Sequence, residues 1–171
     1  MGATRSEDPA ERRSAMDDLL GELMPSLHAL CINILGDGAE AEDALQEALI
    51  AVFRGIDRFR GESQVSTWAY RITVRVAMRW AAKHQRHAAV AYTDTAVALE
   101  SAVTSARVKQ ILEAVTNLSP KHRVVLALFA IQGLAHDEIS EIIGVPEGTV
   151  WSRLHHARLA LATALGEEMS L

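Results

Sequence analysis

Four cationic side chains recur at every fourth position in the middle of the chain, a pattern suited to binding a polyanion. They are Arg71, Arg75, Arg79 and Lys83. Residues four apart lie on the same side of an α-helix, so these four would form a positive ridge. Like charges at this spacing repel each other by about 0.2–0.5 kcal/mol per pair. The ridge therefore predicts an anionic partner, such as the phosphates of a nucleic acid.

The helix that would carry this ridge is expected to begin between Ser63 and Thr67 and to run to about Arg86. Trp68 and Tyr70 lie at its start, where aromatic rings beside a cationic ridge can stack on unpaired bases. The alternative is that both rings belong to the core, and for Tyr70 we favour the core. The predicted core side of the helix carries Ile72, Val76 and Trp80.

A second pattern, over residues 136–165, is typical of two short helices joined by a tight turn. Gly144 permits the turn, and Pro146 fits near the start of the new helix. Apolar residues of the two helices are Ile139, Ile142, Ile143, Val150, Leu154, Ala157, Leu161 and Leu165. The outer face of the second helix carries Thr149, Ser152, Arg153, His155, His156 and Arg158. Hydrogen-bond donors and positive charge on that face favour a helix-turn-helix that reads DNA. An ordinary helical hairpin is the alternative.

Charge is unevenly distributed along the chain, whose overall net charge is −5. Residues 1–53 hold 11 acidic and 3 basic groups, residues 54–87 hold 2 and 8, and residues 88–171 hold 9 and 6. In the first segment, a helix capped by Asp37 would place Glu40, Asp43 and Glu47 on one face. Its expected buried stripe is Leu45, Leu49, Val52, Phe53 and Ile56. An acidic helix beside a basic one suggests two different partners, although a merely solvated acidic face is the alternative.

The remaining pattern predicts an all-α protein of two small helical domains. Residues 1–14 are expected to be a flexible tail. The first domain spans residues 15–87 and starts with a helix that Pro25 bends or divides and Gly36 ends. Residues 88–104 contain no Lys or Arg and are interpreted as a linker. The second domain spans residues 105–171. In it, Ser119 and Pro120 begin a helix that Gly133 stops, and the helix-turn-helix follows.

No metal, cofactor or catalytic centre is predicted. His28 and Cys31 have the spacing of half a zinc site, but the chain has no other cysteine and no third ligand presents itself. The sequence shows no phosphate-binding glycine loop and no nucleophile elbow, so we expect a protein that is not an enzyme. A single cysteine fits a reducing compartment, and no apolar run reaches the roughly 20 residues of a membrane span. We expect a cytoplasmic protein that is not inserted in a membrane.

Two longer segments resemble the bacterial RNA polymerase sigma factors of the extracytoplasmic-function (ECF) class. The segment LGDGAEAEDALQEALIAVFRGIDRFRGES, followed by TWAYRI, resembles conserved region 2. The segment LSPKHRVVLALFAIQGLAHDEISEIIGVPEGTVWSRLHHAR resembles region 4. Together they cover nearly the whole chain, in the family's order and spacing, without signs of regions 1 and 3.

The resemblance implies a role for each surface. The acidic helix would bind the β′ clamp helices of core RNA polymerase, a partner that also includes the β subunit, through Asp43, Gln46, Glu47 and Phe53. The following loop and helix would open the promoter −10 element and hold an extruded base through Arg60, Gly61, Glu62, Ser63, Thr67, Trp68, Arg71, Arg75, Arg79 and Lys83. The helix-turn-helix would bind the −35 element through Glu147, Thr149, Ser152, Arg153, His155 and Arg158.

Several positions differ from the family's usual pattern. Val65 and Ser66 replace a large apolar and a basic residue in front of the TW pair. Ala135 stands where a Ser or Thr usually caps the helix, a change that costs about 1 kcal/mol. Trp151 and Leu159 replace basic residues, so the second domain should bind DNA poorly by itself. Trp151 is open to two readings, contact with DNA or with a regulatory protein.

The sequence thus predicts a sigma factor that binds core polymerase, recognises the −35 and −10 promoter elements and directs initiation of transcription. The resemblance, and the absence of a segment large enough for a sensory domain, imply control by a separate anti-sigma factor, whether or not that factor resides in a membrane. The alternative function is a one-component helix-turn-helix repressor, which would be a dimer that binds duplex DNA without polymerase.

Overall fold

A computed structural model describes residues 9–36, 38–88 and 106–166 of the chain. These residues form helices and short turns, with no strand among them. The α-helices are α1 (Pro9–Leu35), α2 (Gly38–Gly55), α3 (Val65–Ala88), α4 (Ala106–Thr116), α5 (Pro120–Leu126), α6 (His136–Ile143) and α7 (Glu147–Leu165). A 3₁₀ turn, η1 (Ile56–Arg58), follows α2, and a π turn, η2 (Ala127–Ile131), continues α5. The prediction of an all-α fold is confirmed.

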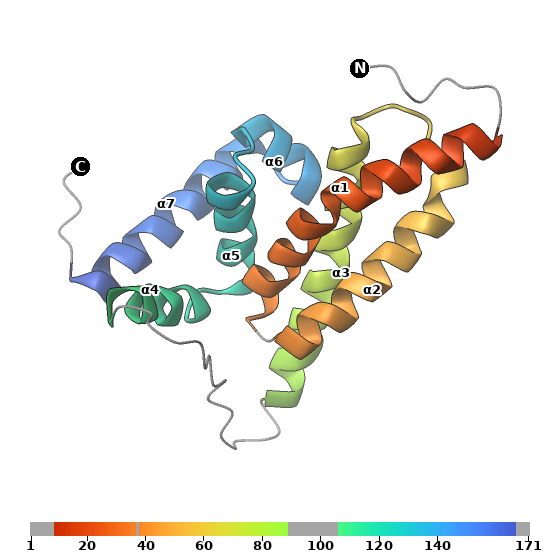
Figure 1. Ribbon diagram of the computed structural model, residues 1–171. Coiled ribbons are helices and arrows are strands. Elements are labelled where there is room, and N and C mark those ends of the chain that lie inside the picture. Colours follow the sequence, from red (N-terminus) through yellow and green to blue (C-terminus); the bar gives the residue numbers. More distant parts are fainter. Residues whose placement is uncertain (1–8, 37, 89–105, 167–171) are drawn as a thin grey trace.

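Helices α1, α2 and α3 lie side by side and form one half of the molecule (Figure 1). The prediction of a tail over residues 1–14 is wrong from Pro9 onward, because α1 begins there. Proline is favoured in the first turn of a helix, and the next four residues, AERR, are good helix formers. Pro25 does not divide α1. One missing hydrogen bond is offset by packing, since Leu27, Leu30 and Ile34 are fully buried.

Helix α2 packs against its neighbours through small side chains. Ala41, Ala44 and Ala48 are fully buried, which lets the helix axes approach closely, and Val52 completes the buried row. The buried face of α2 is rotated about the helix axis relative to the predicted stripe. Val52 and Ile56 are buried as predicted, but Leu45 and Leu49 are only partly buried and Phe53 is 52% exposed. Alanine is weakly apolar, so the sequence pattern gave too much weight to the larger side chains. The predicted cap, Asp37, lies outside the described residues.

Helices α4 to α7 form the other half (Figure 1). Gly133 and Gly144 both adopt φ of +67°, a left-handed conformation that suits glycine and that ends η2 and α6 as predicted. Val150, Leu154 and Ala157 of α7 are buried, which confirms the first three positions of the predicted core stripe. Leu161 and Leu165 are only partly buried, and Ala162 is buried instead.

The two halves share one hydrophobic core. Val124, Val125 and Leu128 from α5 and η2, and Ile139 from α6, belong to the same cluster of buried residues as the core of α1 to α3. Contacts join α3 to α6 and α1 to α5. The helix-turn-helix half is therefore packed directly on the first half. None of the helices in the described ranges is apolar over a length that could cross a bilayer.

Candidate protein and nucleic-acid interfaces

The outward face of α2 combines acidic, amide and apolar side chains. Asp43, Gln46 and Phe53 are exposed, and Glu47 is half-buried. They lie opposite the buried alanines, so the predicted polymerase-binding residues are brought together on one surface. Ile50, which is 50% exposed, extends it and was missed by the sequence reasoning. Its spacing of three residues from Glu47 and Phe53 is the signal that would have found it.

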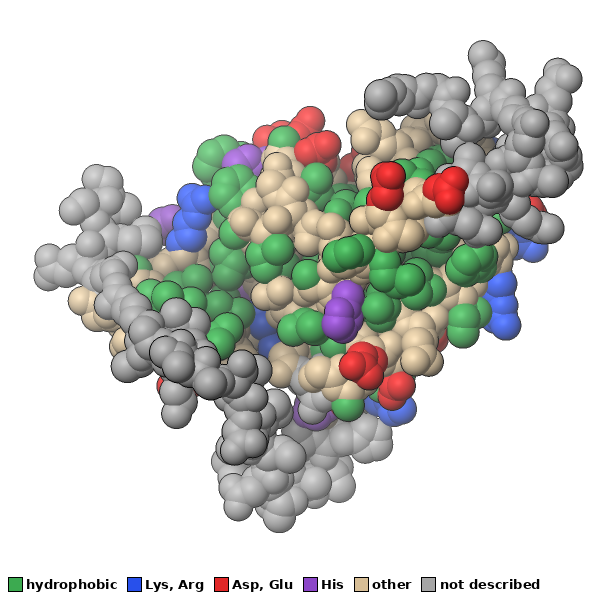
Figure 2. All heavy atoms as spheres, in the orientation of Figure 1, with side chains coloured by type: hydrophobic (Ala, Val, Ile, Leu, Met, Phe, Trp, Pro, Cys, Tyr) green, Lys and Arg blue, Asp and Glu red, His purple; other side chains and the backbone are tan. Residues whose placement is uncertain are grey.

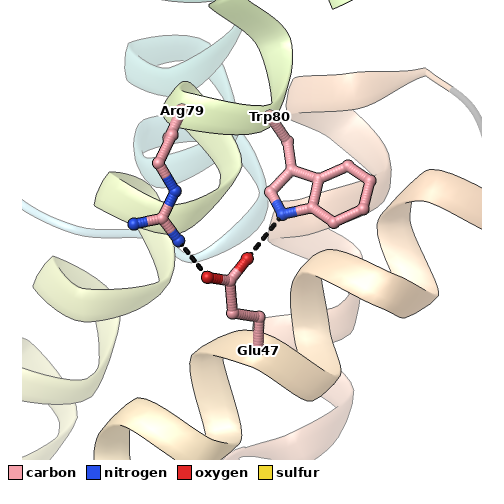
Figure 3. A network of polar contacts seen from close by, with 3 residues as sticks. All are labelled: Glu47, Arg79 and Trp80. Atoms are coloured by element: carbon pink, nitrogen blue, oxygen red, sulfur yellow. Dashed lines mark hydrogen bonds and ion pairs between the residues drawn. The ribbon is translucent and has the colours of Figure 1, made fainter. Parts of the chain in front are cut away.

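Glu47 joins this acidic face to the cationic helix α3. One carboxylate oxygen accepts a hydrogen bond from the Arg79 guanidinium, and the other accepts one from the indole Nε1 of Trp80 at 2.7 Å (Figure 3). The Trp80 hydrogen bond, and then the hydrogen bond and charge of Arg79, hold the pKa of Glu47 below its usual value, although burial opposes them. Glu47 is therefore fixed in its ionised form on the edge of the α2 surface.

The predicted cationic ridge is present on α3, but its members have different surroundings. Arg79 pairs with Glu47, and Arg71 pairs with Glu141 of α6 at 2.7 Å. The Lys83 ammonium lies 5.3 Å from the centre of the Trp80 ring. Arg75 is exposed and has no ion pair or hydrogen bond with any residue in the described ranges. The ridge is accessible at Arg75 without a competing carboxylate, whereas at Arg71 and Arg79 an anion competes with a carboxylate of the chain itself.

The loop before α3 presents polar groups next to a packed aromatic pair. Arg60, Gly61 and Glu62 are exposed, Ser63 is half-buried, and Thr67 is 9% exposed. Gly61 has a φ of +73°, so this turn depends on glycine.

Trp68 is half-buried, with its ring 5.1 Å from that of Phe59 and against Gly55. Phe59 was missed by the sequence reasoning, although an aromatic residue in a polar loop was a visible signal. Tyr70 is 7% exposed and belongs to the core, as predicted.

Helix α7 exposes the residues predicted to bind the −35 element. Glu147, Ser152, His155 and Arg158 are exposed, and Thr149 and Arg153 are half-buried. Arg158 lies over the Phe129 ring at 5.0 Å. Trp151 is 55% exposed and stacks on His136, with ring centres 4.1 Å apart. The exposed face is thus built partly from aromatic contacts between α7 and the preceding elements.

Histidines add titratable charge near this face. His122 of α5 stacks with His156 at 6.2 Å. Burial, and then the nearby charges of His156 and Arg153, lower the pKa of His122. The sequence reasoning did not single out His122, because only the fold places it beside α7.

Cys31 does not form part of a metal site in the described residues. It is fully buried, and burial raises the pKa of its thiol to about 11. No group of three or more His, Cys, Asp or Glu side chains with suitable geometry occurs in the described part of the chain. Cys31 belongs to the buried core of the first half, and His28 is half-buried on α1.

Comparisons with known proteins agree with this geometry. Residues 19–87 match the model of Sigma-70 region 2, and residues 109–161 match that of Sigma-70, region 4. The chain is 33% identical over 168 residues to ECF RNA polymerase sigma factor SigW of Bacillus subtilis strain 168, with 90% of each chain covered.

Two solved structures have the same fold. The sigma factor RpoE of Bartonella quintana, solved with the anti-sigma factor NepR, superposes with a TM-score of 0.70 at 23% identity over 87% of this chain and 97% of that one. CnrH, solved with the cytosolic domain of CnrY, superposes with a TM-score of 0.66 at 18% identity over 90% and 89%. SigW and RpoE are both described as sigma factors. Two region models in order and a full-length relative place this chain in the ECF family of RNA polymerase sigma factors, the subunits that direct the polymerase to promoters.

Proposed function

We propose that this sigma factor uses three separate surfaces in initiation: the α2 face for core polymerase, the loop before α3 together with α3 for the −10 element, and α7 for the −35 element. The observation that carries the proposal is the segregation of charge on two neighbouring helices. The acidic and apolar face of α2 stands beside the cations of α3.

The α2 face suits a protein partner. Ile50 and Phe53 are large apolar side chains with half their surface exposed, and Asp43 and Glu47 flank them with negative charge. An apolar centre with charged edges is typical of a protein interface, in which the charges select the partner and the apolar groups supply most of the affinity. A basic or amphipathic helix of the polymerase clamp would complement it.

The loop before α3 and the cations of α3 suit an opened DNA strand. Arg60 and Arg75 are exposed and can reach phosphates, and Trp68, at the start of α3, is only half-buried. Extruding a base costs a few kcal/mol, about the amount that stacking and phosphate contacts can return. The α7 face has two arginines and two histidines, so we assign it a weaker contribution at the −35 element.

The proposal also covers how this sigma factor is regulated and where in the cell it acts. Both solved relatives were determined as complexes, RpoE with the anti-sigma factor NepR and CnrH with the cytosolic domain of CnrY. Figure 2 shows hydrophobic side chains spread over the face that α1 crosses, and Met24 and Ile32 of α1 are exposed. We assign this chain a cytoplasmic, non-catalytic role that an anti-sigma factor controls by covering such surfaces.

Run-off transcription with purified core polymerase and a promoter library tests the proposal. The parent chain should yield a defined transcript, and Asp43→Arg and Glu47→Arg should each weaken core binding by tenfold or more. Glu22→Arg, an exposed charge reversal on α1, is the matched control and should leave core binding unchanged. No transcript above that of core alone, or equal core binding by all variants, would refute it. A dimer in gel filtration that binds duplex promoter DNA tightly without polymerase would favour the repressor alternative.

A further inference from the structure

A histidine of α5 and a histidine of α7 form a pair where these two helices pack together (Figure 1). The rings of His122 and His156 stack with their centres 6.2 Å apart. The ring of His155 meets that of His156 edge-on at 5.8 Å. His156 is exposed and His122 is half-buried, so the pair is accessible from solvent. The proposed function gives this pair no role and places no residue of α5 at the DNA.

Hydrogen bonds occupy one nitrogen of each ring and leave the other open. His156 Nδ1 lies 2.7 Å from the backbone oxygen of Ser152, which can only accept, so this nitrogen carries a hydrogen and donates it. His122 Nδ1 lies 3.1 Å from the Ser119 hydroxyl, which can donate or accept. Neither Nε2 atom has a hydrogen-bond partner among the residues that the structure describes. Each ring, once protonated, therefore has an Nε2–H group free to donate to an anion.

The ionisable groups near the pair are basic. Within four residues of either histidine along its own helix, every ionisable side chain carries or can take a positive charge: Lys121, Arg123, Arg153, His155 and Arg158. The other elements packed against α5 and α7 are α1, α3, α4, α6 and η2, whose described acidic side chains are Asp18, Glu22, Glu113, Asp137, Glu138 and Glu141. None of these carboxylates forms an ion pair with either ring. The pair therefore has no counter-ion among the described residues.

A bound anion would reverse the repulsion within this group. Two imidazolium rings at this separation repel each other, and Arg153 adds to the repulsion. The lowered pKa of His122, caused first by burial and then by the charges of His156 and Arg153, agrees with this description. An anion offsets the positive charge and can accept hydrogen bonds from the Nε2–H groups. Because the rings would hold their protons more tightly in the complex than in the free chain, the complex should become stronger as the pH falls.

We propose that His122 and His156, in their protonated form, bind a phosphate of the −35 duplex, which adds α5 to the DNA interface and makes this contact tighten as the pH falls. Position identifies the anion: Ser152 and Arg153, within four residues of His156, belong to the α7 face assigned to the −35 element. Phosphates border the groove that a recognition helix enters, and contacts to them position the helix. This inference rests on the proposed function of α7.

Duplex binding by the full chain at two pH values tests the proposal. The probe is a fluorescent mixed-sequence duplex at low ionic strength, because phosphate contacts do not depend on sequence and are strongest in low salt. Binding by the parent chain should tighten about tenfold from about pH 8 to about pH 6. His156→Gln keeps a donor for the Ser152 oxygen but cannot be protonated, so it should bind weakly at both values. His156→Arg carries a permanent charge and should bind tightly at both.

Three further variants assign the effect to the pair. His122→Gln should lose most of the pH dependence, as His156→Gln does. His28→Gln removes a half-buried histidine of α1, away from this contact, and should behave as the parent chain. Because His155 neighbours the pair, loss of the pH dependence in His155→Gln alone would overturn the assignment. Equal pH dependence in the parent, His156→Gln and His156→Arg would do so as well, and since His156 is exposed these two variants should fold normally.

NMR titration of the histidine rings separates failure of this inference from failure of the proposed function. Addition of saturating duplex should move the titration midpoint of His122 to higher pH. If the duplex perturbs the ring signals of His155 but leaves the His122 midpoint unchanged, the phosphate site is overturned while the proposed role of α7 stands. If the duplex perturbs neither ring, the role of α7 fails and the phosphate site fails with it.

Discussion

The carboxylate of Glu47 in α2 is shared between Arg79 and Trp80, two consecutive residues of α3 that reach it from one turn of that helix. An acidic residue proposed to dock on polymerase is thereby held in place by the helix proposed to bind DNA. Both hydrogen-bond donors to Glu47 lie on α3, so a movement of α3 relative to α2 would also move the Glu47 carboxylate. This contact physically couples the proposed polymerase-binding surface to the proposed DNA-binding surface.

Replacing Trp80 by Phe should raise the pKa of Glu47 toward its usual value. The indole hydrogen bond is the largest cause that lowers this pKa, and Phe keeps the ring but has no N–H group. Carboxyl NMR titration of the full chain measures the shift. In Trp151→Phe, whose ring lies on α7, the pKa of Glu47 should stay as in the parent, and an equal change in both variants would contradict the assignment.

Two neighbouring side chains of α2, Phe53 and Val52, should differ in their effects on polymerase binding and on folding stability when each is truncated to alanine. Phe53 is 52% exposed, so Phe53→Ala should change the free energy of unfolding by no more than about 0.5 kcal/mol while weakening core polymerase binding about tenfold. Val52 is fully buried, and Val52→Ala should cost about 2 kcal/mol of stability. Urea denaturation and fluorescence binding assays provide the two numbers. Equal polymerase affinity of Phe53→Ala and the parent would remove Phe53 from the interface.

Gly55 is required by the ring of Trp68. A Cβ atom at this position would lie 2.8 Å from Trp68 Cζ2, closer than side-chain carbons approach, so Gly55→Ala should displace the ring and cost about 1–3 kcal/mol. Gly148→Ala in α7 meets nothing within 4 Å and should stabilise the chain by about 0.5–1 kcal/mol. Denaturation with tryptophan fluorescence compares the two. If Gly55→Ala were as stable as Gly148→Ala, the packing of Trp68 would not be as described.

A serine at position 135 should complete the cap of α6. Ala135 has the extended conformation of a cap residue, and its backbone N–H already donates to Glu138 at 2.8 Å, but its methyl group cannot accept the return hydrogen bond from the backbone N–H of Glu138. Ala135→Ser should therefore raise the free energy of unfolding by about 1 kcal/mol. Ala135→Val, which also lacks an acceptor, should bring no gain. A serine variant no more stable than the valine variant would show that the site is already satisfied.

Local rules predicted much of the architecture. The helix-turn-helix followed from Gly144, Pro146 and a regular apolar stripe, each of which acts through its own backbone or its neighbours four residues away. The start of α3 and the burial of Tyr70 were likewise predicted. The error at residues 9–14 arose because polar helix formers without an apolar stripe resemble a tail. The error at Phe53 arose because α2 packs closely against its neighbours through alanines, and this close contact turns the larger Phe53 outward.

The sequence by itself determined the helices, their order and the separation of acidic from basic segments, since spacing along one helix is enough to decide which side chains share a face. Only the tertiary structure decided that Glu47 accepts hydrogen bonds from Arg79 and Trp80, and that Arg71 forms an ion pair with Glu141. Glu47 and Arg79 are 32 residues apart, and Arg71 and Glu141 are 70 apart. No local periodicity encodes such a pairing, because it depends on how the buried faces of whole helices fit against one another.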